Sequence, residues 1–387
     1  MKPVHRYYFD HNATTPVSPE VFEAIAPMMT EVYGNASSIH YFGQKARQAL
    51  DDARTRVAAM LGATAEEIVF TSGGTEADNL ALFGIAQNGH AVITTIEHPA
   101  VLGAGSKLAA VTHVPVDGRG VVDPQEIRRA LRPDTKIISV MHANNELGTI
   151  QPLREIAKIA READVVFHSD GVQAAGKIPV NVADLGVDLY SITGHKFYAP
   201  KGVGALYVRK GTRLAPMFHG GHHERDMRPG TENVAGAVGL GRAAQWIVEQ
   251  AAQECLRVGE LRDRLERGIL DRVQGSRVNA AGAPRTPNTT NIRFDGIDTE
   301  PLLIALDLRG FAVSSGAACS SGVTEPSHVL IAIGLTREQA RSSLRFSLGR
   351  SNTVEQVDAL IEAVAESVAH LRRVAGQLAG KPAPAYA

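Results

Sequence analysis

Short apolar runs rich in β-branched residues alternate with helix-like stretches between residues 67 and 193. The runs are EIVFT, AVITTIE, VTHVPV, TKIISVMHA, VVFHSD and LYSIT, and stretches such as TEADNLALFGIAQ and PLREIAKIAREA lie between them. A strand that is apolar along its whole length must be covered on both faces, and helices that connect parallel strands provide that cover. The pattern therefore predicts an α/β fold with a parallel or mixed sheet between helices.

Local signals locate several of the helices. Ser18-Pro19 is typical of a capped helix start and precedes an apolar-periodic run to Tyr33. A second helix is expected over residues 44–61, ending at Gly62. Asp123 begins DPQE, which predicts a capping box at the start of another helix.

The length and the change of pattern along the chain predict more than one domain. A chain of 387 residues corresponds to roughly two or three domains. A long helical stretch over residues 233–272 is followed by a mixture of strands (NIRF, FAVSS, SLRFSL) and helices, which is typical of an α+β domain. We predict a large domain over residues 15–258 and a small domain formed by residues 1–14 and 259–387.

Composition excludes several classes of partner. The formal net charge is −1, from 40 basic and 41 acidic residues, which gives no electrostatic reason to expect nucleic acid or an anionic membrane. No apolar run approaches the ~18 residues that span a bilayer, and the opening MKPVHRYYFDHNATTP lacks the pattern of a signal peptide. The two cysteines, Cys255 and Cys319, form no disulfide framework, so we expect a cytoplasmic protein.

Chemically distinctive residues follow several of the predicted strands. Lys196 lies in SITGHKFYAPKG directly after an apolar run, and Asp170 ends VVFHSD with Gln173 just beyond it. Asn145 follows TKIISVMHA, and His98 follows AVITTIE. Because ligands bind at the carboxyl ends of strands in open α/β sheets, we expect these side chains around one site.

The segment FTSGGTEADN joins a strand to a helix through Gly73 and Gly74. The glycines let backbone N–H groups converge, Thr75 offers a hydroxyl, and the helix N-terminus adds positive potential, so this segment predicts an anion site. A phosphate site, an aspartate, a histidine and a strand-end lysine together favour pyridoxal phosphate. Lys196 would form a Schiff base with the aldehyde, and Asp170 would pair with the ring nitrogen.

Each residue also has a structural interpretation when it is taken alone. Lys196 could be a solvated turn residue, His98 a capping or core histidine, and Asp170 and Thr75 helix caps. Arg350 could be part of a surface ion pair worth about 0–1 kcal/mol. The joint occurrence of these residues favours the cofactor site.

A histidine-rich segment, HGGHHERD, offers a competing kind of site. His219, His222, His223 and Glu224 could bind Zn²⁺. The spacing is not HExxH, and the flanking glycines favour an active-site or subunit-contact loop. We therefore expect no metal.

Eleven motifs occur in order along nearly the whole chain: FDHNATTP, GNASSIHYFG, TSGGTEADN, EHPAVL, NNELGTIQP, HSDGVQAAGK, GHKFYAPKGVG, GGHHERDMRPGTEN, SSGAACSSG, EPSHVL and RFSLGR. On these motifs the chain resembles the NifS/IscS-type cysteine desulfurases of the class V aminotransferase group. The resemblance implies a fold-type I pyridoxal-phosphate transferase, with a large domain built on a mixed, mostly parallel sheet and a smaller α+β domain. His11 departs from the pattern, because asparagine or tyrosine is more usual there.

The resemblance also implies a role for each matching residue. The expected catalytic residues are Cys319, Lys196 and His98. The expected cofactor-binding residues are Lys196, Gly74, Thr75, His98, Asn145, Asp170, Gln173, Thr193, His195 and Thr231. Thr231 would reach the phosphate of the neighbouring subunit in a homodimer. The expected substrate-binding residues are Asn145, Arg350 and Asn12, with Arg350 as a fork for the substrate carboxylate.

Cys319 lies in SSGAACSSGVTEP, and the long spacing from there to Arg350 resembles the long-loop desulfurases. Small residues favour a mobile loop, which we place at about residues 314–326. The resemblance implies conversion of L-cysteine to L-alanine with transfer of sulfur to Cys319 as a persulfide. The expected acceptor of that sulfur is an iron–sulfur scaffold protein of the IscU/NifU type.

Other functions stay open at this point. A selenocysteine lyase or another class V lyase or aminotransferase would share the cofactor site. A non-catalytic sulfur or metal carrier could use the same fold and the histidine-rich segment. A nicotinamide dehydrogenase is disfavoured, because no GxGxxG follows a strand. The sequence does not identify the sulfur acceptor, the cellular role or the order of the cysteine loop.

Overall fold

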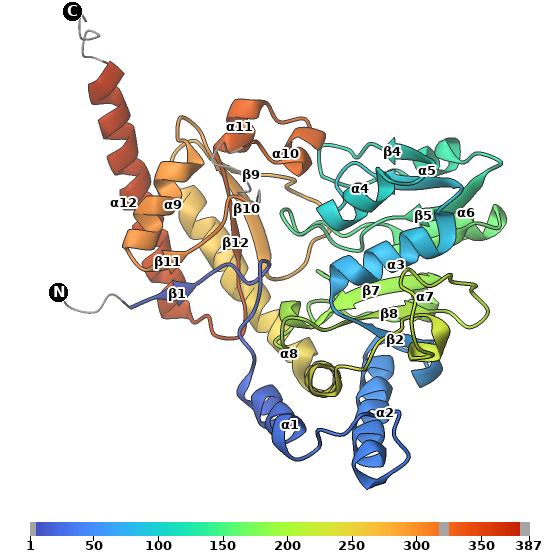
Figure 1. Cartoon of the computed structure of the whole chain (residues 1–387). Coiled ribbons are helices and arrows are strands. Elements are labelled where there is room, and N and C mark those ends of the chain that lie inside the picture. Colours follow the sequence, from blue (N-terminus) through green and yellow to red (C-terminus); the bar gives the residue numbers. More distant parts are fainter. Residues whose placement is uncertain (1–4, 317–324, 380–387) are drawn as a thin grey trace, which may run out of the picture.

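The computed structural model describes residues 5–316 and 325–379, and its largest element is a seven-stranded sheet in the order β2-β8-β7-β6-β5-β3-β4 (Figure 1). The strands are β2 (Ile68–Thr71), β3 (His90–Thr94), β4 (Ala110–Val114), β5 (Thr135–Ser139), β6 (Val166–Asp170), β7 (Leu189–Thr193) and β8 (Gly204–Val208). Every pair is parallel except the two that β8 makes, with β7 and β2. The predicted mixed, mostly parallel sheet is confirmed.

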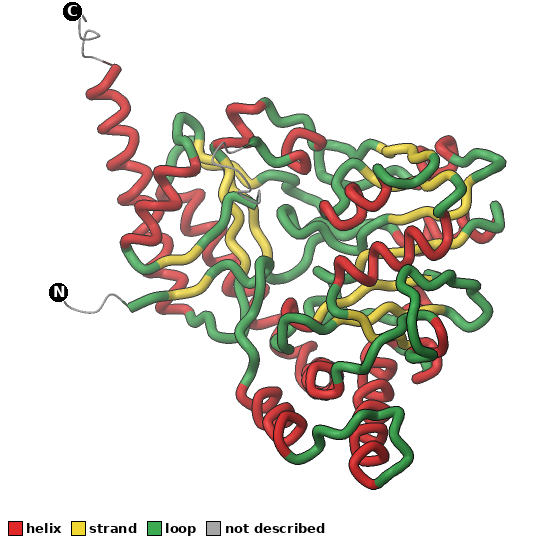
Figure 2. The backbone as a smooth tube through the Cα atoms, viewed as in Figure 1, coloured by secondary structure: helices red, strands yellow, loops and turns green. Residues whose placement is uncertain are grey.

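Helices cover both faces of this sheet, as the apolar strands require (Figure 2). Alternate residues of one strand point to opposite faces. In β5, Ile138 joins the core that includes α2, α6 and α8, whereas Ile137 joins the core that includes α3 and α4. The helices of this part are α1 (Pro19–Thr30), α2 (Tyr41–Leu61), α3 (Gly74–Ala86), α4 (Pro99–Gly105), α5 (Pro124–Ala130), α6 (Leu153–Glu162) and α7 (Val182–Leu185).

Most of the predicted helix ends occur where the local signals indicate. Gly62 ends α2 in the left-handed region with φ 66°. The Asp123 side chain caps α5 by accepting a hydrogen bond from the Gln125 N–H at 2.9 Å. Glu126 forms an ion pair with Arg129 instead of completing the predicted capping box.

The long helix α8 (Val234–Arg272) contributes to two cores. Leu240 packs in the core of the large sheet, whereas Leu261 and Leu265 pack in a second core. That second core lies under the antiparallel sheet β12-β10-β9. The remaining elements are β1 (Tyr7–Tyr8), β9 (Ser276–Val278), β10 (Thr289–Phe294), β11 (Phe311–Ala312), β12 (Ser343–Ser347), α9 (Thr299–Leu308), α10 (His328–Ala332), α11 (Arg337–Arg341) and α12 (Val354–Ala379). The domain boundary at residue 258 stays a prediction.

The N-terminal segment links these two parts. β1 pairs with β11 in parallel, and Asp10 bridges to Ser347 at the end of β12. A few residues later, the Thr15 N–H donates to the His195 carbonyl at 2.8 Å, in the turn that follows β7. Within the described ranges, no helix is both long and apolar enough to cross a lipid bilayer.

A buried ion pair anchors the histidine-rich segment to α2. Arg54 donates to both carboxylate oxygens of Glu224 at 2.7 Å, and the two side chains are only 7% and 3% exposed. Glu224 begins the short helical turn η3 (Glu224–Asp226) and also accepts a hydrogen bond from the Phe70 N–H at 2.9 Å. Removing one partner would leave the other charge buried and unpaired.

We therefore expect Glu224→Ala to destabilise the fold by about 3–5 kcal/mol, because Arg54 would keep an uncompensated charge. The midpoint of urea unfolding, followed by circular dichroism, measures this effect. Glu162→Ala is the matched control, because the Arg128–Glu162 pair is 47% and 59% exposed and should contribute about 0–1 kcal/mol. Equal midpoints for the two variants would contradict the prediction.

Candidate active site

A hollow of about 320 Å³ lies where the carboxyl ends of the parallel strands meet the N-terminal segment and β12. It brings together ten of the predicted site residues, which are Asn12, Gly74, Thr75, His98, Asn145, Asp170, Gln173, Thr193, His195 and Lys196. Seven further residues line it, which are Ala13, Asp78, Met141, Val172, Ser314, Gly316 and Arg345. The side chains that the strand ends predicted to converge therefore do converge.

Lys196 contributes an amine to this hollow. It ends the helical turn η2 (Gly194–Lys196), which follows β7 directly. Its Nζ donates to the carbonyl oxygens of Asn12 at 2.6 Å and Ala13 at 2.7 Å. Burial, with the nearby Arg345 cation, lowers the pKa of Lys196 to about 8. A lysine with that pKa has a large neutral, nucleophilic fraction near physiological pH.

Asp170 and His98 line the same hollow as Lys196. Asp170 ends β6, and its Oδ1 accepts a hydrogen bond from the Val172 N–H at 2.9 Å. Burial raises the pKa of the Asp170 carboxyl, while His98 and Lys196 act in the opposite direction. A buried carboxyl of this kind gains from a cation placed in the hollow, such as a protonated ring nitrogen.

His98 serves as a helix cap as well as a lining residue. Its Nδ1 accepts a hydrogen bond from the Ala100 N–H at 3.1 Å, at the start of α4. The ring is exposed to the hollow, yet the surrounding protein atoms lower its pKa. Both interpretations given above for this histidine, a cap and a site residue, therefore fit its geometry.

The glycine turn before α3 has the form of a phosphate site. α3 begins at Gly74 without a side-chain cap, so the N–H groups of its first turn are available to a ligand. A Cβ added at Gly74 would lie 2.8 Å from Cγ2 of Val172, so only glycine leaves this space open. Thr193 is packed on the same turn, and the His195 Nδ1 lies 3.2 Å from the Thr14 hydroxyl.

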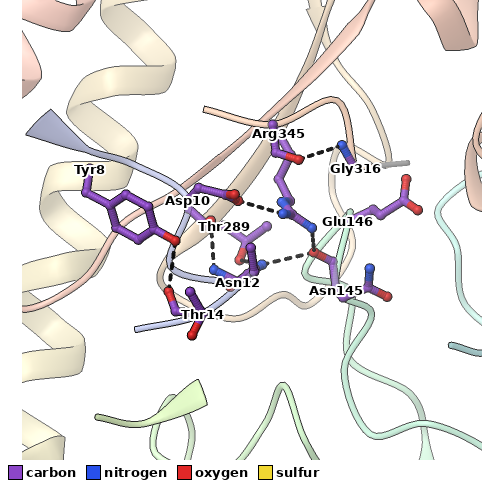
Figure 3. A network of polar contacts seen from close by, with 12 residues as sticks. Tyr8, Asp10, Asn12, Thr14, Asn145, Glu146, Thr289, Gly316 and Arg345 are labelled. Carbon is purple, nitrogen blue, oxygen red and sulfur yellow. Dashed lines mark hydrogen bonds and ion pairs between the residues drawn. The ribbon is translucent and has the colours of Figure 1, made fainter. Parts of the chain in front are cut away.

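Asn12 is fully engaged within the protein. Its Nδ2 donates to the Asn145 carbonyl at 3.0 Å and to Thr289 Oγ1 at 2.9 Å, and its Oδ1 accepts from Lys177 Nζ at 2.8 Å and Asn288 Nδ2 at 3.0 Å. Figure 3 shows it between Thr289 and Asn145. Its side chain therefore has no free polar atom for the predicted contact with a substrate, and only its carbonyl oxygen faces Lys196.

Arg350 does not line this hollow. Its guanidinium carbon is 3.1 Å from the centre of the Trp246 ring, and its Nη1 pairs with Glu20 at 3.2 Å. It lines a second cavity, of about 40 Å³, to which Lys196 also contributes. Gly349 turns the chain after β12, so Arg350 leaves the strand toward α1 and α8.

Arg345 is the arginine that lines the hollow. Its Nη2 pairs with Asp10 at 2.6 Å and its Nη1 donates to the Asn145 carbonyl at 3.0 Å, as Figure 3 shows. Its Nε is buried and has no hydrogen-bond partner among the described residues. The sequence analysis missed Arg345, although an arginine between Leu344 and Phe346 in an apolar strand was a usable signal.

Two predicted residues are not tested by this hollow. Thr231 is exposed and lies outside it, as a residue that serves a neighbouring subunit would. Cys319 falls in residues 317–324, outside the described ranges. Among the side chains that the structure describes, no group of three or more His, Cys, Asp or Glu is arranged to hold a metal ion.

Comparisons with known proteins agree with this geometry. The model of the aminotransferase class-V family matches residues 7–360. A cysteine desulfurase IscS of Dictyoglomus turgidum (strain DSM 6724 / Z-1310) is 46% identical over 376 residues, which cover 95% of each chain. A solved NifS-like protein superposes with a TM-score of 0.88 at 37% identity, covering 95% of this chain and 100% of that chain. A structure of SspA in complex with cysteine has a TM-score of 0.79 at 36% identity, covering 88% and 98%.

The fold, the buried lysine and carboxylate, and the uncapped helix start define an α/β enzyme of the pyridoxal-phosphate type. The chain belongs to the aminotransferase class-V family. The residues of the hollow fit the cofactor, because Lys196 can hold its aldehyde, Asp170 its ring nitrogen, and Gly74 and Thr75 its phosphate. When bound, the cofactor supplies an electron sink for a carbanion.

The lowered pKa of Lys196 predicts how the cofactor-free protein takes up pyridoxal phosphate. Only the neutral amine attacks an aldehyde, so the uptake rate should rise with pH through about 8 and then level off. An unperturbed lysine would titrate near ~10.4. Stopped-flow absorbance of the protein–cofactor chromophore measures the rate.

Two variants test whether the pH midpoint of the uptake rate reports the Lys196 amine. Arg345 lowers the pKa of Lys196, so Arg345→Met should move the midpoint upward. Arg154→Met changes an exposed residue on α6 and should leave the pH midpoint of the uptake rate unchanged. A midpoint near 10 in the parent protein would show that the burial of Lys196 does not tune its amine.

Proposed function

We propose that this protein is a pyridoxal-phosphate-dependent cysteine desulfurase, which converts L-cysteine to L-alanine and passes the sulfur to a thiol. The observation that carries this proposal is the convergence of Lys196 and Asp170 on one hollow beside an arginine, Arg345. The similarity to IscS-named relatives over 95% of each chain supports the reaction, and the SspA complex with cysteine supports the substrate.

Three side chains of the hollow have separate roles in the proposed reaction. Lys196, once released by the substrate amine, takes the Cα proton and returns it, and its lowered pKa suits both directions. His98, which also lines the hollow, is a second proton carrier, because its lowered pKa keeps the imidazole neutral near pH 7. Asp170 holds the ring nitrogen in its protonated form.

We assign the substrate carboxylate to Arg345, in place of Arg350. Asp10 and the Asn145 carbonyl hold the Arg345 guanidinium in place at 2.6 and 3.0 Å, so its position is set before a substrate arrives. The buried Nε offers an additional donor. Arg350 is enclosed by Trp246 and Glu20, and binding a substrate there would first require that contact to break.

The sulfur acceptor of the first step is Cys319. Its thiolate attacks the substrate sulfur and forms a sulfur–sulfur bond. The carbon–sulfur bond breaks, its electron pair stays on the Cβ atom, and a proton completes alanine. The second cysteine, Cys255, does not suit this role. Cys255 is half-buried on α8, donates to the Lys177 carbonyl at 3.0 Å, and burial raises the pKa of its thiol.

The functional unit is a homodimer. Six large apolar side chains are exposed over α1, α2 and the segment between them, which are Phe22, Met29, Tyr33, Ile39, Tyr41 and Phe42. Ile39 alone is 91% exposed, and such a cluster indicates an interface. In this dimer we assign Thr231, which is exposed, to the phosphate site of the neighbouring subunit.

The persulfide then goes to an acceptor protein. The IscS name of the similar desulfurases supports an iron–sulfur scaffold of the IscU/NifU type as that acceptor. We place the reaction in the cytoplasm, where reducing conditions keep thiols free.

The two cysteines give a matched test of the function. With L-cysteine and dithiothreitol, the parent protein should release alanine and sulfide, and Cys255→Ser should match it. Cys319→Ser should lose more than 100-fold of the sulfide release, because the nucleophile is gone. Alanine and sulfide are measured separately, and L-selenocysteine is assayed in parallel to test for a selenocysteine lyase.

Lys196→Ala should bind no cofactor covalently and release no alanine. Alanine formation from Lys196→Ala, or a protein that takes up no pyridoxal phosphate, would refute the proposed reaction. Full sulfide release by Cys319→Ser would refute only the choice of nucleophile.

The two arginines of RFSLGR give a second matched test. Arg345→Lys should lower kcat/KM for L-cysteine about 10–100-fold, because charge-assisted hydrogen bonds of about 1.5–3 kcal/mol are lost. Arg350→Lys should change kcat/KM less than 3-fold and instead lower the thermal midpoint. If Arg350→Lys raises KM and Arg345→Lys leaves it unchanged, the reassignment is wrong.

A further inference from the structure

Lys177 is a buried lysine that the proposed mechanism does not use. It is 8% exposed and lies four residues beyond Gln173, in the turns that follow β6. Its Nζ donates to Asn12 Oδ1 at 2.8 Å and to Gln173 Oε1. No carboxylate of the described residues forms an ion pair with it.

The groups around Lys177 do not neutralise the positive charge of its amine. The groups that act on it are the cations Lys196 and Arg345 and the thiol of Cys255, and Lys177 in turn acts on His11. Burial and the two cations lower the pKa of Lys177 well below its usual value. A buried amine among cations is costly, so an anion close by would stabilise it.

Gln173 connects Lys177 to the hollow. Lys177 donates a hydrogen bond to Oε1 of the Gln173 amide. This contact fixes the orientation of the amide, so that its Nε2 is the donor group. That Nε2 donates to the Asn12 carbonyl at 3.0 Å, and Gln173 lines the hollow. The same carbonyl accepts from Lys196 Nζ at 2.6 Å, so the donor group of Gln173 and the reactive amine meet at one atom.

We propose that Lys177 is a positioning residue that keeps the donor group of Gln173 directed at the cofactor's ring oxygen and holds that oxygen as an anion. The inference rests on the proposed function, because it concerns a pyridoxal-phosphate site. An anionic ring oxygen nearby would raise the pKa of Lys177 and keep its amine charged. That positive charge behind Gln173 in turn favours the form with an anionic ring oxygen and an unprotonated Schiff base. Lys177 therefore lowers the pKa of the Schiff base at Lys196.

The test is a titration of the holoenzyme without substrate. Absorbance spectra between pH 6 and pH 10 give the pKa of the Schiff base for the parent, Lys177→Met and Lys177→Arg. We expect Lys177→Met to raise this pKa by roughly one unit or more, because an unscreened charge is removed. Lys177→Arg keeps the charge and should stay within about 0.3 unit of the parent.

Lys158→Met is the matched control, because Lys158 is exposed on α6, and it should titrate like the parent. A parental pKa in Lys177→Met would overturn the inference, since a merely structural lysine would change stability but not the Schiff base. If Lys177→Met does not fold, Lys177→Gln replaces it with the same expectation. If neither neutral variant folds, a shift above 0.3 unit in Lys177→Arg overturns the inference.

Failure of the inference about Lys177 can be distinguished from failure of the proposed function. A protein without bound pyridoxal phosphate gives no Schiff base to titrate, and that result counts against the proposed function. A protein that binds the cofactor and titrates alike with and without the Lys177 charge counts against the role of Lys177 alone.

Discussion

The hydrogen bonds of Asn12 are the interaction on which this active site depends. The N-terminal segment leaves the small sheet at Asp10 and reaches the turn after β7 at Thr15, and Asn12 lies between these points. Its side chain joins Thr289 and Asn288 on one side to Asn145 and Lys177 on the other. Buried polar groups that are fully satisfied rigidify their surroundings, so this residue fixes the small sheet against Lys196.

The hydrogen bonds of Asn12 lie between two arginines, five positions apart, that have different surroundings. Arg345 lies within β12, where Asp10 and the Asn145 carbonyl hold it over the hollow. Arg350 follows the turn at Gly349 and stacks on Trp246 of α8. Its ring contact and ion pair join the end of β12 to α1 and α8. The side chains of Lys177, Gln173 and Lys196 also donate hydrogen bonds to oxygen atoms of Asn12.

Burial in the hollow disfavours positive charge on its amine and imidazole groups. Burial lowers the pKa of Lys196 to about 8, and that of His195 to about 4. Burial also raises the pKa of Asp170. A cofactor with a cationic ring nitrogen and an anionic phosphate would offset part of the free-energy cost of burying charge here. It supplies opposite charge to Asp170 and to the first turn of α3. The site is therefore arranged for a zwitterionic ligand.

The sequence by itself determined six of the seven strands of the large sheet, several helix ends and the strand-end residues of the hollow, because local periodicity and strand-end chemistry are encoded in adjacent residues. The resemblance to a known family added Asn12, Thr193 and His195, and β8 was not predicted. Six strand segments and the ends at Gly62 and Asp123 follow from such patterns. Only the tertiary structure showed that Arg345, and not Arg350, lines the hollow, and that the side chain of Asn12 is saturated with internal hydrogen bonds. It also showed that no carboxylate among the described residues pairs with Lys177. Those properties depend on contacts between residues more than a hundred positions apart, and no local pattern reports such contacts.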